Sequence, residues 1–160
     1  MRADILTVLA ISTAFFSSYV QAADEPVCQV TAWDGDMLGD PFPEENIWYG
    51  SEALATVVPK DGIWPITADR ALIAVKSFWW SPGYEPGMES NFTVTVENLF
   101  DSSKVAHVSR VTNAGEMDGD KWYMLVGIDI PHVGCWRVTG SYLGQELTFV
   151  VKSIDFESTE

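Results

Sequence analysis

The sequence predicts an all-β fold, an antiparallel sandwich of about seven to nine strands. Apolar residues in residues 23–160 nowhere recur with the 3.6-residue period of an amphipathic helix over three turns. Short runs of alternating or β-branched residues occur instead, and Gly, Pro, Asn and Asp separate them. Because these strands have no helices between them, we expect antiparallel pairing in two packed sheets.

The first 22 residues are predicted to be a cleaved secretory signal. Residues 5–20 form an almost uninterrupted apolar and small-residue run that ends in Val20-Gln21-Ala22, with small side chains where a signal peptidase requires them. The run is too short to span a bilayer comfortably, and the polar residues 23–26 follow it. We therefore expect residues 23–160 to be a single β-sandwich domain in the periplasm or outside the cell, not inserted in the membrane.

The chain is acidic, with 9 Lys and Arg against 23 Asp and Glu and a net charge of −14. Nucleic acids and anionic membrane surfaces select for Lys and Arg, so neither is expected as a partner. An acidic surface keeps an exported protein soluble, and it leaves open the attraction of a basic partner or of cations.

The chain contains two cysteines, Cys28 and Cys135. An even number in an exported chain predicts a disulfide, and closing so long a loop removes about 4–5 kcal/mol of unfolded-state entropy. The alternative is two separate buried thiols. Cys28 follows Glu25-Pro26-Val27, which does not resemble a lipoprotein cleavage site, so no lipid anchor is expected.

In the first half of the mature chain we expect three strands. Residues 28–33 alternate in polarity, residues 54–58 are rich in β-branched side chains, and residues 70–77 contain an apolar run. Residues 34–46 are expected to be a loop because they hold two prolines and five carboxylates. The expected turns are residues 59–62 and the aromatic segment 78–84.

In the second half the alternation is clearer. Phe92, Val94 and Val96 are expected to face the core of a strand over residues 92–97. The remaining strands are expected at 105–112, 121–130, 134–142 and 146–154, with a loop at 113–120 and a turn at 143–145.

The closing hairpin resembles the last two strands of an immunoglobulin-like sandwich. Residues 131–140 supply a Pro-x-x-Gly corner that leads into Cys135-Trp136-Arg137-Val138-Thr139-Gly140, and residues 147–151 supply a final alternating strand. More narrowly, the chain resembles a group of uncharacterised secreted bacterial proteins, often lipoproteins, that share a Gly-Cys-Trp-x-Val-Thr-Gly ending. The further matching segments are Cys28-Gln29-Val30-Thr31, Trp48-Tyr49-Gly50 with Leu54, Pro59-Lys60-Asp61-Gly62, and Trp79-Trp80 with Pro86-Gly87.

This resemblance implies an antiparallel immunoglobulin-like β-sandwich and an extracytoplasmic location, and it carries no activity. The chain departs from the group in lacking a lipobox.

The sequence predicts no enzyme and no cofactor. The only histidines are His107 and His132, and no Gly-x-Ser-x-Gly motif accompanies them. Asp34-Gly35-Asp36 and Asp118-Gly119-Asp120 pair carboxylates as a calcium site does, but neither has the longer ligand run of a calcium loop. Asp-Gly is also common turn chemistry, so neither loop is assigned a metal. Copper ligands would come from the two histidines and from Met37, Met88, Met117 and Met124.

The aromatic residues are the best candidates for a ligand surface, since the chain contains seven tryptophans. Trp79, Trp80 and Tyr84 lie around Pro82-Gly83, and exposed rings offer large contact area at low entropic cost. The alternative is that adjacent tryptophans face opposite sides, one of them in the core.

The expected function is therefore a secreted, non-enzymatic binding or interaction module whose partner is a protein, peptide or glycan. One rival is a carbohydrate- or peptide-binding module that uses Trp79, Trp80 and Tyr84. The other is a periplasmic protein that binds calcium or copper.

Overall fold

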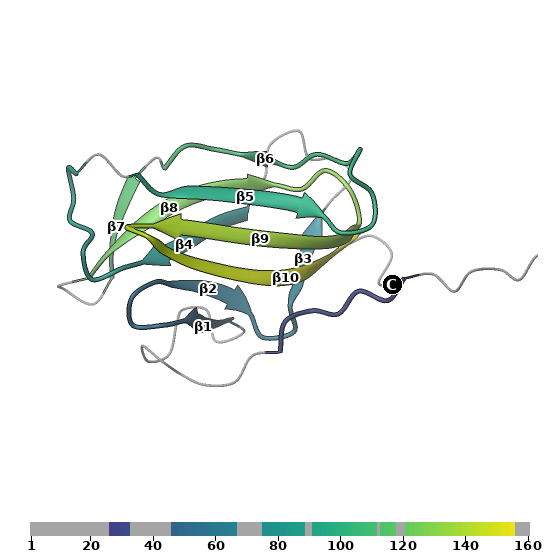
Figure 1. The fold of residues 1–160 in the computed structure, drawn as a ribbon, viewed down its shortest axis with the longest axis horizontal. Helices are drawn as coiled ribbons and strands as arrows, with labels where there is room; N and C mark the ends of the chain where they lie inside the picture. Colours follow the sequence, from purple (N-terminus) through teal and green to yellow (C-terminus); the bar gives the residue numbers. More distant parts are fainter. Residues whose placement is uncertain are drawn as a thin grey trace, which may run out of the picture.

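The protein is all-β in the part that the structure describes, and its strands form two sheets (Figure 1). The computed structural model describes residues 26–32, 46–66, 75–88, 91–111, 113–117 and 121–155. The strands are β1 (Asn46–Gly50), β2 (Ala55–Pro59), β3 (Ile63–Ile66), β4 (Val75–Trp80), β5 (Thr93–Asn98), β6 (His107–Val108), β7 (Asn113–Met117), β8 (Lys121–Asp129), β9 (Gly134–Tyr142) and β10 (Gln145–Asp155).

A six-stranded sheet has the order β1-β2-β4-β8-β6, with β7 also paired to β8, and a four-stranded sheet has the order β3-β10-β9-β5. In Figure 1 β4 and β8 lie behind β9 and β10, so the two sheets form separate layers. All pairings are antiparallel except that of β10 with β3, which is parallel. The expectation of purely antiparallel pairing is wrong at this one ladder.

The core lies between the inner faces of the two sheets and is built by alternation along the strands. In β9, Trp136 and Val138 are fully buried while Arg137 between them is exposed. In β10, Phe149 makes edge-on ring contact with Trp64 of β3 at 5.9 Å between ring centroids. This contact joins the parallel edge strand to the centre of the core.

Several predicted strands are confirmed to within one residue at either end. They are those expected at 54–58, 92–97, 121–130, 134–142 and 146–154, which correspond to β2, β5, β8, β9 and β10. The inward faces expected for Phe92, Val94 and Val96 also hold, because all three pack in the core. The expected turn at 59–62 is present, with the Gly62 N–H donating to the Pro59 carbonyl at 3.0 Å.

The turn predicted at 78–84 is wrong in its first half. Strand β4 continues to Trp80, because its backbone pairs with β2 on one side and with β8 on the other. The turn begins only at Ser81, whose carbonyl accepts the Tyr84 N–H at 3.1 Å. The expected strand 70–77 is described only from Val75, where β4 starts.

Five further assignments also differ from the expectation. Residues 113–117, predicted as loop, form β7 by pairing with β8. Of the strand predicted at 105–112, the described residues 105–111 form only the short β6 and an isolated bridge between Val105 and Glu97. Neither β1 nor β3 was predicted. The described part of the strand predicted at 28–33 is not a regular strand. Thr31 nevertheless binds Val150 of β10 through two hydrogen bonds, one from its own N–H and one accepted by Oγ1.

The predicted disulfide between Cys28 and Cys135 is confirmed, with 5.4 Å between the Cα atoms. Since Trp136 faces the core, Cys135 lies on the outer face of β9, and the bridge ties residues 26–32 to that face. The expected loop at 34–46 falls almost wholly outside the described residues.

Candidate functional site

Trp79 is a core residue and not part of a ligand surface. Because β4 is extended through residues 79 and 80, the two adjacent tryptophans face opposite sides of the sheet. The Trp79 side chain is 0% exposed and lies 5.0 Å from the Phe92 ring and 6.0 Å from the Phe149 ring, measured between centroids. Its Nε1 donor is buried and makes no hydrogen bond to the protein.

Trp80 lies on the outer face of the six-stranded sheet. It packs there against Trp48 and Tyr123, whose rings stack at 5.4 Å between centroids. Ala55 is the β2 neighbour of Trp80 in the ladder, and its small side chain leaves room for the rings over the sheet. This cluster was not predicted from the sequence, because β1, which carries Trp48, was not predicted.

Tyr84 is buried at one end of the sandwich. Its ring is 8% exposed and meets the Tyr142 ring edge-on at 6.4 Å between centroids. Burial raises the pKa of Tyr84 above its ordinary value of 10.0, and the neighbouring Tyr142 raises it further. The structure thus places Trp79 in the core, Trp80 on an outer face and Tyr84 under a turn, and does not bring the three rings together as one exposed surface.

The loops around Tyr84 nevertheless form a distinct surface, which we call the loop end. It consists of the β1–β2 connection (residues 51–54), the start of the β4–β5 connection (residues 81–88) and the β9–β10 turn with its flanks (residues 142–146). The Tyr84–Tyr142 contact joins the second and third of these segments. A Cβ atom placed on Gly50 would meet Leu147, so the first segment lies beside the start of β10.

Leu143 and Met88 are the large apolar side chains most exposed at the loop end, at 64% and 49%. The opposite end of the sandwich exposes others, at the N-terminal segment and at the β5–β6 and β8–β9 connections: Val27, Phe100, Val105 and Val133. Both ends of the sandwich therefore present apolar side chains to solvent.

The β9–β10 turn has an unusual backbone. Its two central residues, Leu143 and Gly144, have φ angles of 49° and 79°, which is the pattern of a type I′ turn. Leu143 is the only non-glycine residue with positive φ in the part of the chain that the structure describes. Its Cδ1 atom lies only 3.0 Å from where a Cβ on Gly83 would stand, so glycine at 83 allows the two turns to approach each other.

The loop end is acidic. Its three segments contain exposed Glu52, Glu85 and Glu146 and no Lys or Arg. A cationic group approaching this end therefore meets a carboxylate on each of the three segments.

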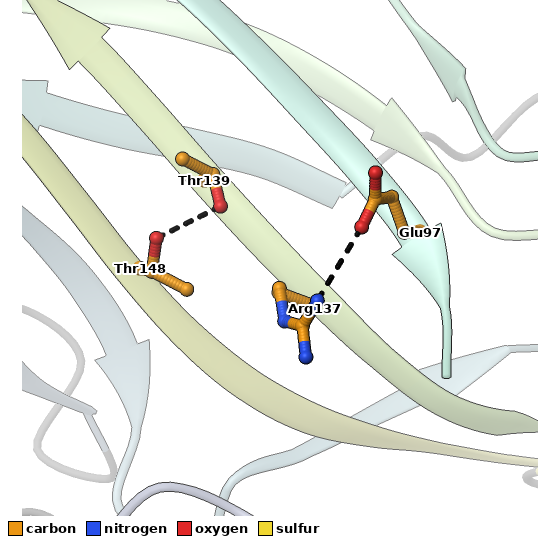
Figure 2. Close-up of polar contacts among 4 residues, drawn as sticks. All are labelled: Glu97, Arg137, Thr139 and Thr148. Carbon is orange, nitrogen blue, oxygen red and sulfur yellow. Dashed lines mark hydrogen bonds and ion pairs between the residues drawn. The ribbon is translucent and has the colours of Figure 1, made fainter. Parts of the chain in front are cut away.

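The outer face of the four-stranded sheet is polar, and neighbouring strands pair their side chains across it (Figure 2). Arg137 of β9 lies 3.6 Å from the Glu97 carboxylate of β5, and both side chains are exposed. Next to this pair, the hydroxyls of Thr139 and Thr148 share a hydrogen bond of 2.9 Å. Exposed pairs of this kind contribute about 0–1 kcal/mol, and they give a well-solvated surface.

The structure provides no geometric support for a metal site in the residues that it describes. Both Asp-Gly-Asp loops, at residues 34–36 and 118–120, lie outside the described residues, as does Met37. In the segments that are described, no three His, Cys, Asp or Glu side chains gather as metal ligands do.

The copper candidates are dispersed. His107 and His132 are exposed, Met124 is in the core and Met88 is at the loop end, while only the backbone of Met117 is described. His132 helps to lower the pKa of Asp101, but hydrogen bonds from Ser103 are the main cause.

The described residues contain no helix with the length and apolarity needed to cross a bilayer. Comparisons of the chain with models of protein families, with curated proteins and with solved structures found no match.

Proposed function

We propose that this chain is an exported, non-enzymatic binding module with an immunoglobulin-like fold, and that it binds a protein or peptide through the loop end. The observation that carries the proposal is the exposure of apolar side chains, 64% for Leu143 and 49% for Met88, on adjacent turns of a disulfide-braced scaffold. Apolar side chains are exposed at the opposite end as well, so the choice of the loop end rests also on its acidic side chains and on the fold correspondence described next.

The strand orders support the immunoglobulin-like assignment. Constant-type immunoglobulin domains have one sheet with strands A, B, E and D and a second with C, F and G. The order β2-β4-β8, with β7 beyond β8, corresponds to the first, and the order β5-β9-β10 corresponds to the second. In this correspondence β4–β5 is the B–C connection and β9–β10 is the F–G connection.

The same correspondence supports the choice of surface. Variable domains bind antigen through the loops at the end where the B–C and F–G connections lie. Here the equivalent segments touch through Tyr84 and Tyr142, and Leu143 projects beside Gly83. This support is an analogy of fold, and it adds to the exposed side chains and the carboxylates of the loop end.

Export is supported by the apolar leader at residues 5–20 together with the oxidised Cys28–Cys135 pair, since stable disulfides form in oxidising compartments. Fractionation of cells that express the full chain tests this part. We expect a periplasmic or secreted product that begins at Ala23 and has no free thiol. Recovery of a reduced protein with its leader intact in the cytosol would contradict it.

A selection experiment tests the binding function. The mature chain, residues 23–160, is panned against a random peptide display library and applied to a glycan array. We expect peptides to be enriched, and we expect Met88→Ser to weaken their binding several-fold. Val133→Ser, at the opposite end and also 49% exposed, is the matched control and should leave binding unchanged. No enrichment, binding to glycans alone, or equal effects of the two substitutions would overturn the proposal.

A further inference from the structure

The stability of the fold does not explain why residue 143 is a leucine. The type I′ turn of a two-residue hairpin favours Asn-Gly, because both central residues need positive φ. A leucine in that conformation brings its Cβ close to the following carbonyl oxygen, which destabilises the turn. Leu143 is nonetheless there, with φ of 49° and with 64% of its side chain in solvent.

The turn holds Leu143 in a fixed place. The adjacent Tyr142 is only 3% exposed and meets the buried Tyr84 edge-on, and β9 and β10 are paired up to Tyr142 and Gln145. On its other side the Leu143 side chain lies against Gly83. The backbone that carries the side chain is thus ordered before binding, which lowers the entropy lost when a partner binds.

The charges around Leu143 indicate the kind of partner. Glu85 lies on the neighbouring turn, Glu146 follows the hairpin turn, and Glu52 is on the β1–β2 connection. These carboxylates attract Lys and Arg, and they disfavour both an anionic lipid surface and a second copy of the same end.

We propose that Leu143 is the anchor of the loop end and inserts into an apolar pocket, rimmed by Lys or Arg, on a protein partner. This inference rests on the proposed binding function and deepens it. It assigns the leucine to recognition, at a position where asparagine would give a more stable turn.

The substitution Leu143→Asn tests both halves of this inference. Because asparagine adopts positive φ readily, we expect the variant to melt about 3 °C higher than the wild type. The same variant should bind peptides selected on the wild type at least 10-fold more weakly, about the loss expected when one buried anchor is truncated. Selected peptides should share an apolar residue flanked by Lys or Arg, and their binding should weaken as salt is raised.

The control is Val105→Asn, which removes an apolar side chain of similar exposure, 60%, from the opposite end and should not alter peptide binding. A lower melting temperature for Leu143→Asn would show that the leucine is retained for packing, and would overturn the inference. Unchanged peptide binding by Leu143→Asn would also overturn it, while sensitivity to Met88→Ser alone would leave the proposed binding function intact. Binding of the wild type to vesicles of phosphatidylcholine and phosphatidylglycerol, lost in Leu143→Asn, would replace the protein partner with a membrane.

Discussion

Replacing Gly140 with alanine is expected to destabilise the fold by about 3 kcal/mol. A Cβ atom on Gly140 would lie 2.9 Å from Cε3 of Trp79 and closer still to Cζ3 and Cη2. Carbon atoms in contact are normally about 3.5–4.0 Å apart, so the indole has to move by about 1 Å or more. It has little room to do so, because Trp79 is fully buried between Phe92 and Phe149.

The measurement is urea unfolding followed by tryptophan fluorescence, with the free energy of unfolding taken from linear extrapolation. Trp79→Phe, which shortens the ring, supplies a double-mutant cycle. If the clash is the cause, Gly140→Ala should cost at least about 2 kcal/mol less in the Trp79→Phe background. Ser141→Ala, on the next residue of the same strand, controls for changes to β9 itself. A Gly140→Ala cost below about 0.5 kcal/mol, or an equal cost in both backgrounds, would refute the packing described for Trp79.

Three further predictions concern the bridge, a buried hydrogen bond and alkaline pH. The double substitution Cys28→Ser with Cys135→Ser should lower the free energy of unfolding by about 4–5 kcal/mol, because the bridge closes a loop with a sequence separation of 107. A loss below about 1 kcal/mol, measured by urea unfolding, would contradict this prediction. Ser153→Ala removes the acceptor of the 2.9 Å hydrogen bond from Trp136 Nε1 and should cost about 1–3 kcal/mol, so an unchanged urea midpoint would count against that bond. The pKa of Tyr84 is raised in the folded state, so its contribution to stability is complete below pH 10.0 and is lost as pH rises through the folded-state pKa. Melting temperatures above pH 10.0 should therefore fall less steeply for Tyr84→Phe than for the wild type, and parallel curves would contradict the assignment.

The strands that the sequence predicted best are those whose neighbours in the chain already define their two faces. In β9, Trp136 and Val138 alternate with polar residues, and the same alternation runs through Leu147 and Phe149 in β10. The two-residue period of apolar side chains therefore predicts both the strand and the face of it that is buried.

The strands that the sequence missed depend on partners far along the chain. Strand β3 is short and contains Pro65, which argues against a strand in the sequence, yet it pairs in parallel with the end of β10. Residues 113–117 have the composition of a loop and become β7 only through pairing with β8. Because Ser81-Pro82-Gly83 is a turn signal, the predicted turn began too early and included Trp79. Strand β4 in fact continues to Trp80.

The candidate site could be predicted only in part. The sequence pointed to the neighbourhood of Pro82-Gly83, and this neighbourhood is part of the loop end. The sequence indicated exposed aromatic rings there, but Tyr84 is buried and the exposed side chain is Leu143. Exposure of Leu143 depends on the φ angles of the hairpin turn and on the approach of Gly83, and neither has a signal in a single sequence.

Amide hydrogen exchange of the mature chain, with and without a peptide selected on it, tests most directly whether this protein binds through the loop end. Amides that a partner covers, or whose local opening it suppresses, exchange more slowly. We predict that the peptide slows exchange in residues 81–88 and 142–146 and leaves the opposite end unchanged. Slowed exchange centred on residues 98–105 and 131–134, or on the outer face of the four-stranded sheet, would contradict the account.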